Sequence, residues 1–186
     1  ESGLSASVDL STLDGTNGFV LEGIDAGDHA GISVSAAGDV NGDGYADILL
    51  GASAADPNGN SDAGETYVVF GKESGFGSSV DLSTLDGTNG FVLEGIDTSD
   101  QSGLSVSTAG DVNGDGYTDV LVGAQYADPN GDNSAGETYV VFGKASGFAA
   151  SLDLGTLDGT NGFVLEGIEA SDYSGLSVST AGDVNG

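Results

Sequence analysis

The sequence predicts an all-β protein made of four-stranded antiparallel blades of a β-propeller, and three observations lead to this fold class. The 186-residue chain repeats with a period of 72, so that LDGTNG at 13–18 returns at 85–90 and at 157–162. Short apolar runs alternate with turn residues, drawn from 34 glycines and only two prolines. No window keeps the 3.6-residue apolar period of an amphipathic helix, so we expect almost no helix. The chain is therefore best understood as repeat units.

Four strands are expected in each repeat. The run FVLEGI at 19–24 follows an Asn-Gly turn, a strong hairpin signal. Residues 31–36 alternate small polar and apolar side chains, as a half-buried strand does. The continuous apolar run at 46–52 is typical of a strand buried on both faces. Residues 66–71 are rich in β-branched and aromatic side chains, which strands favour.

Two linkers join these strands. Residues 56–64 form a turn-rich loop, whereas the longer segment 73–90 carries Val80 and Leu82, which we expect to add a short edge strand or to pack over one end. Four short antiparallel strands in a regular repeat make one propeller blade. A single blade cannot bury both of its faces, so neighbouring blades must stack on it.

The strand count divides the chain into two complete blades and two partial ones. We expect a partial blade with a lone outer strand at 1–30, complete blades with acidic loops at 31–102 and 103–174, and a truncated further blade at 175–186. This set cannot close a ring. We therefore predict a fragment of a longer propeller, the alternative being an assembly in which partner chains supply the missing strands.

Charge excludes several classes of partner. The formal net charge is −28, and the only basic side chains besides one histidine are Lys72 and Lys144. Nucleic acid and anionic lipid bind mainly through lysine and arginine, so neither is expected. No apolar stretch is long enough for a membrane span, so no membrane insertion is expected. Cysteine is absent, which excludes disulfides and thiolate zinc sites. Repulsion within a chain of net charge −28 destabilises a compact state unless cations offset it.

An acidic loop recurs in register with the repeat. The sequence DVNGDGYAD at 39–47 returns as DVNGDGYTD at 111–119 and begins again at Asp183. Each complete copy places oxygen-bearing side chains at positions 1, 3, 5 and 9, with glycine at position 6. This alternation lets a short loop wrap around a hard cation such as Ca²⁺.

Two other interpretations of the loop compete with this one. An EF-hand or dockerin-like loop begins in the same way but carries an acidic residue at position 12 and is flanked by helices. Position 12 is Leu50 in one copy and Val122 in the other, each within an apolar strand. The simpler alternative is an Asp/Asn/Gly turn that binds no metal.

At these residues the sequence resembles the FG-GAP repeats of integrin α-subunits and of their bacterial relatives. The segments that carry the resemblance are the two acidic loops with their flanking pieces, Ala30-Gly31 and Gly51-Ala52-Ser53 in the first copy, Ser102-Gly103 and Gly123-Ala124-Gln125 in the second. Both copies lack the Phe of FG and the Pro of GAP. The resemblance implies a propeller of about seven blades, with Ca²⁺ in the loop between the first two strands of each blade.

The expected ligands follow from this loop. In the first copy they are the side chains of Asp39, Asn41, Asp43 and Asp47 with the carbonyl of Tyr45, and in the second those of Asp111, Asn113, Asp115 and Asp119 with the carbonyl of Tyr117. All-oxygen ligation suits Ca²⁺ better than softer metals, and Mg²⁺ is the second choice. The third loop contains only Asp183 and Asn185 and is expected to be empty or poorly formed.

Other residues indicate no catalytic site. His29 is replaced in the other repeats, and the serines lack a histidine to activate them, so we do not expect an enzyme. Strand aromatics could form a carbohydrate platform but are more simply packing residues; they are Tyr67, Phe70, Tyr139 and Phe142.

Three functions remain open at this point. The first is a calcium-binding propeller module, extracellular or on the cell surface, that acts as a structural or adhesion scaffold for a protein or surface-glycan partner. The second is an accessory propeller of a secreted enzyme. The third is a self-associating filament or sheath subunit, in which exposed strand edges pair between chains.

Overall fold

The computed structural model describes residues 7–145 and 147–180, and Asp183 and Asn185 lie outside this part of the chain. The all-β prediction is confirmed: the helical segments of the described residues are single 3₁₀ turns of three residues each, namely Leu10–Thr12, Pro57–Gly59, Leu82–Thr84, Pro129–Gly131 and Leu154–Thr156. None of these described helices is long and apolar enough to cross a membrane.

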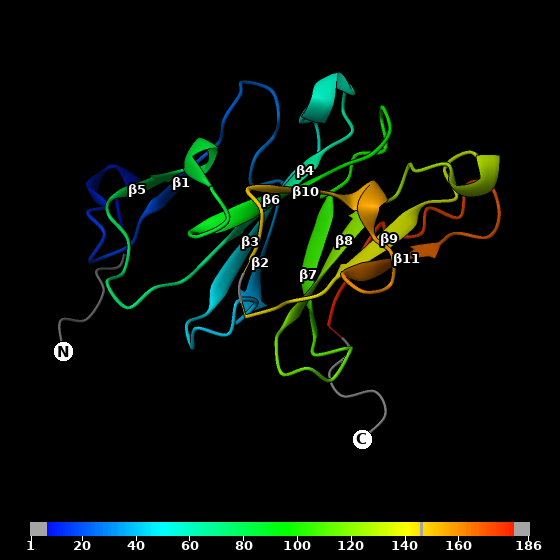
Figure 1. Cartoon of the computed structure of the whole chain (residues 1–186). Helices are drawn as coiled ribbons and strands as arrows, with labels where there is room; N and C mark the ends of the chain where they lie inside the picture. Colours follow the sequence, from blue (N-terminus) through cyan, green and yellow to red (C-terminus); the bar gives the residue numbers. More distant parts are fainter. Residues whose placement is uncertain (1–6, 146, 181–186) are drawn as a thin grey trace.

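Two antiparallel sheets form the body of the molecule (Figure 1). The first sheet contains, in spatial order, β2 (Ser33–Gly38), β3 (Asp47–Ala52), β4 (Glu65–Val69) and β6 (Gly90–Glu94). The second sheet contains β7 (Ser105–Gly110), β8 (Asp119–Ala124), β9 (Glu137–Val141) and β11 (Gly162–Glu166) in the same order. Each sheet thus contains a four-stranded antiparallel up-and-down unit, the arrangement of a propeller blade. In the first sheet, β10 (Ser151–Asp153) adds a fifth strand beside β6.

The long linkers tie neighbouring repeats together. β5 (Ser79–Asp81) pairs in parallel with β1 (Val20–Glu22), and β10 (Ser151–Asp153) pairs in parallel with β6. Each linker strand therefore reaches back to the outermost strand of the repeat before it. Leu82, directly after β5, is 1% exposed. Both expectations for this linker, an edge strand and a packed leucine, are confirmed.

The ends of some strands differ from the predicted ones, because a backbone N–H there donates its hydrogen bond to a group outside the neighbouring strand. β2 begins two residues later than expected, because Gly31 has a φ of +90° and Ile32 donates its N–H to the His29 carbonyl in a turn. β2 also continues to Gly38 through a bulge after Ala36. β4 ends at Val69, and two residues later the N–H of Gly71 donates to the Asp47 carboxylate.

The first sheet is buried on both faces by its neighbours. Leu49 and Val68 belong to a core shared with the second sheet, which contributes Val120, Val122 and Tyr139. On its other face, residues of the same strands pack with the linker that joins β4 to β6 and with the preceding outer strand β1; these are Leu50, Tyr67 and Val69, against Leu82, Leu85 and Leu21. Sheet stacking thus creates a core that neither sheet could form alone.

Candidate metal centre

The two acidic loops occupy equivalent positions in the two sheets. Residues 39–46 join β2 to β3, and residues 111–118 join β7 to β8. Both loops project from the same edge of the paired sheets, the lower edge in Figure 1. The loops are exposed turns. Each turns sharply at the glycine of position 6, which adopts a positive φ angle of 89° at Gly44 and 92° at Gly116.

In the first loop, the side chains at positions 1, 3 and 5 converge through hydrogen bonds. Asp39 accepts the N–H of Asp43 at 3.0 Å on Oδ1 and that of Gly44 at 2.9 Å on Oδ2. The Oδ1 of Asn41 also accepts the N–H of Asp43, at 3.0 Å, while its Nδ2 donates to Asp43 Oδ2. Asp43 Oδ1 accepts the N–H of Tyr45. The loop is thus folded around its own acidic side chains.

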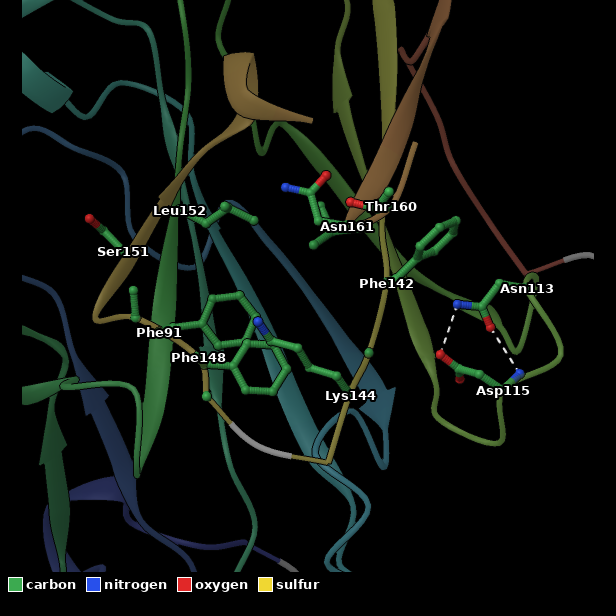
Figure 2. Close-up of a pocket in the computed structure, with 14 residues that line it drawn as sticks. Phe91, Asn113, Asp115, Phe142, Lys144, Phe148, Ser151, Leu152, Thr160 and Asn161 are labelled. Carbon is green, nitrogen blue, oxygen red and sulfur yellow. Dashed lines mark hydrogen bonds between the residues drawn. The ribbon is translucent and has the colours of Figure 1, made fainter. Parts of the chain in front are cut away.

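The second loop repeats this network. Asp111 accepts the N–H groups of Gly114 and Asp115 on Oδ1 and that of Gly116 on Oδ2. Asn113 accepts the N–H of Asp115 at 2.9 Å and donates its Nδ2 to Asp115 Oδ2, as Figure 2 shows. Asp115 Oδ1 accepts the N–H of Tyr117 at 3.0 Å. The same nine-residue pattern therefore folds in the same way at two places in the chain.

The position-9 aspartates are buried at the start of a strand. Asp47 is 1% exposed and Asp119 is fully buried. Asp47 accepts the N–H of Val40 on Oδ2 and that of Gly71 on Oδ1, both at 2.8 Å. Burial raises the pKa of Asp47 to about 6, and Asp39 and Asp43, which are of like sign, add to the rise. Burial likewise raises the pKa of Asp119.

The donor set has the chemistry of a hard-cation site. Among the described residues, no three His, Cys, Asp or Glu side chains are gathered closely enough to hold a metal ion by themselves. The structure brings positions 1, 3 and 5 together and leaves position 9 bonded to backbone N–H groups of its own sheet. A carboxylate has about four lone-pair sites, so these N–H bonds leave acceptor capacity. The like charges of Asp43 and Asp39 add to the rise in the pKa of buried Asp47, and a cation would offset that repulsion. Positions 1, 3 and 5 supply oxygen donors of the kind that Ca²⁺ prefers.

One residue that contacts the first loop was missed by sequence reasoning. Thr118, at position 8 of the second loop, donates its N–H to the Asp39 carbonyl at 3.1 Å and accepts the Asp39 N–H on its hydroxyl at 3.2 Å. The only signal for it in the sequence is that position 8 differs between the copies, being Ala46 in the first.

A cavity of about 320 Å³ lies beside the second loop (Figure 2). Asn113 and Asp115 reach it from the loop, and Phe91, Phe148 and Lys144 line it from the first sheet and the long linker. The Nζ of Lys144 lies 4.8 Å from the centre of the Phe148 ring. An equivalent cavity beside the first loop is lined by Asp43, Lys72 and Phe76, among others.

Three of the four strand aromatics are buried packing residues, and the fourth, Phe142, is half-buried with its ring centre 5.9 Å from that of Phe163. Tyr67 is fully buried, Tyr139 is 1% exposed and Phe70 is 5% exposed. The hydroxyls of the two tyrosines donate to Glu65 and Glu137, each two residues earlier on the same strand. Burial raises the pKa of both glutamates. His29 lies exposed in the connection before β2.

The two segments that contain the acidic loops are similar to known proteins. The family model of the FG-GAP repeat matches residues 30–69 and 102–141, which contain β2 to β4 and β7 to β9. Integrin alpha-PS2 of Drosophila melanogaster is 35% identical over 135 residues, which are 70% of this chain and 9% of the integrin. Integrin alpha pat-2 of Caenorhabditis elegans is 34% identical over 161 residues, which are 81% of this chain and 13% of the integrin.

A relative of a different class also matches. Phosphatidylinositol-glycan-specific phospholipase D of Bos taurus is 34% identical over 113 residues, which are 61% of this chain and 13% of the phospholipase. The chain thus spans between 9% and 13% of the length of these three relatives.

Proposed function

Because the chain is an FG-GAP repeat protein, we propose that it forms part of a calcium-binding β-propeller that serves as an extracellular structural or adhesion scaffold. The observation that carries the calcium assignment is the pair of buried position-9 aspartates, Asp47 and Asp119, each at the end of a loop of further oxygen donors. A bound cation would offset the repulsion among these carboxylates in a chain of net charge −28.

The ligands that we propose are the loop oxygens, supplied by Asp39, Asn41, Asp43, Asp47 and the Tyr45 carbonyl in the first site and by Asp111, Asn113, Asp115, Asp119 and the Tyr117 carbonyl in the second. The amide oxygen of Asn41 accepts the Asp43 N–H with one of its two lone pairs and has a second for the ion, and Asn113 has the same arrangement. Ca²⁺ tolerates irregular geometry, whereas Mg²⁺ demands a near-ideal octahedron. When bound, the ion supplies positive charge and cross-links the loop.

The division into repeats belongs to the same proposal. We assign residues 1–30 to a partial blade, 31–102 and 103–174 to complete blades, and 175–186 to the start of a further blade of a larger propeller. Support comes from the linkers, since β10 is supplied to the first sheet by the following repeat. The outer strand of the second sheet, β11, would receive the corresponding strand from the next repeat.

The scaffold role is supported by the integrin relatives and by the cavities beside the loops. Cell-surface partners of a protein or glycan kind could contact the Phe148, Lys144 and Asn161 side chains that line the larger cavity. Repulsion by the −28 charge disfavours nucleic acid. A second candidate is an accessory propeller of a secreted enzyme, and the similarity to a phospholipase D favours it.

Calorimetry with Ca²⁺ tests the metal assignment. Wild-type chain should bind two ions, Asp43→Ala or Asp115→Ala one ion, and the double variant none. Asp132→Asn is the matched control, because it removes one exposed acidic charge outside the loops and the first repeat carries Asn60 at the equivalent position. Equal stoichiometry in all variants would contradict the assignment, and so would binding that Mg²⁺ reproduces at the same concentration.

A further inference from the structure

The two acidic loops are joined across the interface between the sheets by one hydrogen bond between backbone groups and one between a backbone N–H and a side-chain hydroxyl. Asp39, at position 1 of the first loop, has both its N–H and its carbonyl bonded to Thr118, at position 8 of the second loop. Tyr117 and Asp119, the neighbours of Thr118, are proposed ligands of the second ion. A proposed ligand of one site is therefore held by a residue that lies between two proposed ligands of the other.

A second set of contacts links the two position-9 aspartates. Asp119 Oδ1 accepts the N–H of Gly143 at 2.9 Å. The next residue, Lys144, donates its N–H to the carbonyl of Val40 at 2.9 Å. Val40 in turn donates its own N–H to Asp47 Oδ2 at 2.8 Å. Three hydrogen bonds, joined through the backbone of Gly143-Lys144 and of Val40, thus link the two buried carboxylates.

Side-chain packing reinforces these bonds. The ring of Tyr117 covers Gly42, at position 4 of the first loop, so closely that a β-carbon placed on Gly42 would collide with it. Thr118 covers Gly38 in the same manner. The effect on exposure is large: Val40, at position 2 of the first loop, is 1% exposed, whereas Val112, at position 2 of the second, is 52% exposed. The second loop therefore supports the first.

We propose, on the basis of the calcium-binding function above, that the two loops bind Ca²⁺ with positive cooperativity. An ion in the second loop orders residues 117–119, and these residues then hold Asp39, Val40 and Gly42 in place for the first loop. Ordering shared contacts once lowers the entropic cost of the second binding event. The two affinities must rise by the same factor, because coupling between binding sites is reciprocal.

Repulsion between the two ions opposes this coupling, and salt weakens that repulsion because both loops lie at the surface. The chain carries a net charge of −28, so it remains strongly negative after it has bound two divalent cations. The second ion is consequently still attracted by the protein as a whole.

The test is a two-site Ca²⁺ titration of the wild-type chain and of Thr118→Ala and Thr118→Val. Alanine is the natural residue at the equivalent position, Ala46, and valine keeps the shape of threonine without its hydroxyl. Wild type should bind the second ion about fivefold or more tightly than a statistical two-site model predicts. Both variants should bring this factor towards one. Ala46→Thr is the control, since it adds a hydroxyl at the exposed position 8 of the first loop and should leave the factor unchanged.

Hydrogen exchange gives a readout that does not depend on fitting affinities. In Asp43→Ala, which disables the first site, Ca²⁺ at the second site should still slow exchange of the Asp39 and Lys144 amides. Two equal, independent affinities in wild type, unchanged in both Thr118 variants, would overturn the cooperativity and leave calcium binding intact. Absence of any Ca²⁺ binding by the wild-type chain would instead overturn the proposed function, and the cooperativity with it.

Discussion

The ring of Phe148 stacks on the ring of Phe91, with centroids 4.5 Å apart and planes inclined by 13°. Phe91 belongs to β6 of the first sheet, and Phe148 lies in the linker of the following repeat. The pair Phe19 and Phe76 makes the equivalent stack one repeat earlier, at 4.3 Å. Phe148 also lies beneath Lys144. One aromatic stack per repeat therefore fastens each linker to the outer strand of the preceding repeat.

Removal of this stack should loosen the linker and destabilise the fold. Phe91→Ala should cost about 3–5 kcal/mol, because Phe91 is 1% exposed and its loss leaves a cavity. Phe148→Ala should cost less, since its ring is half-buried. Urea unfolding of both single variants and the double variant should give a coupling free energy of about 0.5–1.5 kcal/mol.

Leu176→Ala is a suitable control for this double-mutant cycle, because the Leu176 side chain is 59% exposed. Its replacement should change the unfolding free energy by less than about 0.5 kcal/mol. Strict additivity of the two phenylalanine substitutions would show that the stack contributes nothing beyond the area that each ring buries.

Close approach of the two sheets requires glycine at one point of β3. A β-carbon placed on Gly51 would collide with the Gly103 carbonyl and with the Ser33 hydroxyl, which itself donates to that carbonyl at 2.7 Å. Gly51→Ala should therefore push the sheets apart and cost about 1–3 kcal/mol or more. Gly77→Ala, where the nearest atom is 3.9 Å away, should be neutral or slightly stabilising in the same thermal unfolding assay. Similar melting of both variants would argue against the tight contact.

Much of each sheet could be predicted from the sequence because the determinants are local. The apolar run of β3 predicts burial on both faces, and five of its six residues are buried. Gly31 lies within an equally plausible alternating run, but its positive φ delays the start of β2. Whether a glycine adopts that conformation depends on the turn that the flanking residues form, and the alternation of side chains does not reveal it.

Contacts between repeats were much less predictable. The local alternation in 39–47 predicts that positions 1, 3 and 5 meet in one turn, and their hydrogen bonds show that they do. The bonds between Thr118 and Asp39 depend instead on how the two sheets stack. These residues are 79 positions apart, so no local sequence pattern reveals their contact. The parallel pairing of β10 with β6 also depends on that stacking.

Stability should decline as the pH rises through the range in which Asp100 ionises. This side chain is 7% exposed, and burial, followed by the Asp97 charge, raises its pKa to about 7. Glu137 and Asp128 also face it and act in the same direction. The folded state therefore holds this proton more tightly than the unfolded state, whose pKa is close to 3.8. The contribution to stability is present below about pH 4, is lost as the pH rises to about 7, and is constant above that.

Asp100→Asn should remove this dependence, so the difference in unfolding free energy between variant and wild type should change by about 2–3 kcal/mol from pH 5 to pH 8. Urea unfolding with a chelator present measures it without interference from metal in the loops. Asp132→Asn, at an exposed position, is the control. Parallel stability curves for wild type and Asp100→Asn would show that Asp100 ionises as freely as in the unfolded chain.

Chelation should lower the melting temperature sharply if the loops bind Ca²⁺ as proposed. Each loop holds three carboxylates, one of them buried, and an ion bound only by the folded state stabilises that state by mass action. At a Ca²⁺ concentration 100 times the dissociation constant, each site contributes about 2.7 kcal/mol. Two sites should then raise the melting temperature by about 10 °C or more, since each kcal/mol is worth about 2–4 °C in a chain of this size.

The decisive comparison is between wild type and the Asp43→Ala/Asp115→Ala double variant, each melted with Ca²⁺ and with chelator. Wild type should lose its added stability on chelation, and the double variant should melt at the same temperature under both conditions. Asp132→Asn should behave as wild type, because its exposed carboxylate belongs to neither loop. A wild-type melt that chelator leaves unchanged would mean that the buried charges of Asp47 and Asp119 are tolerated through their backbone N–H bonds alone.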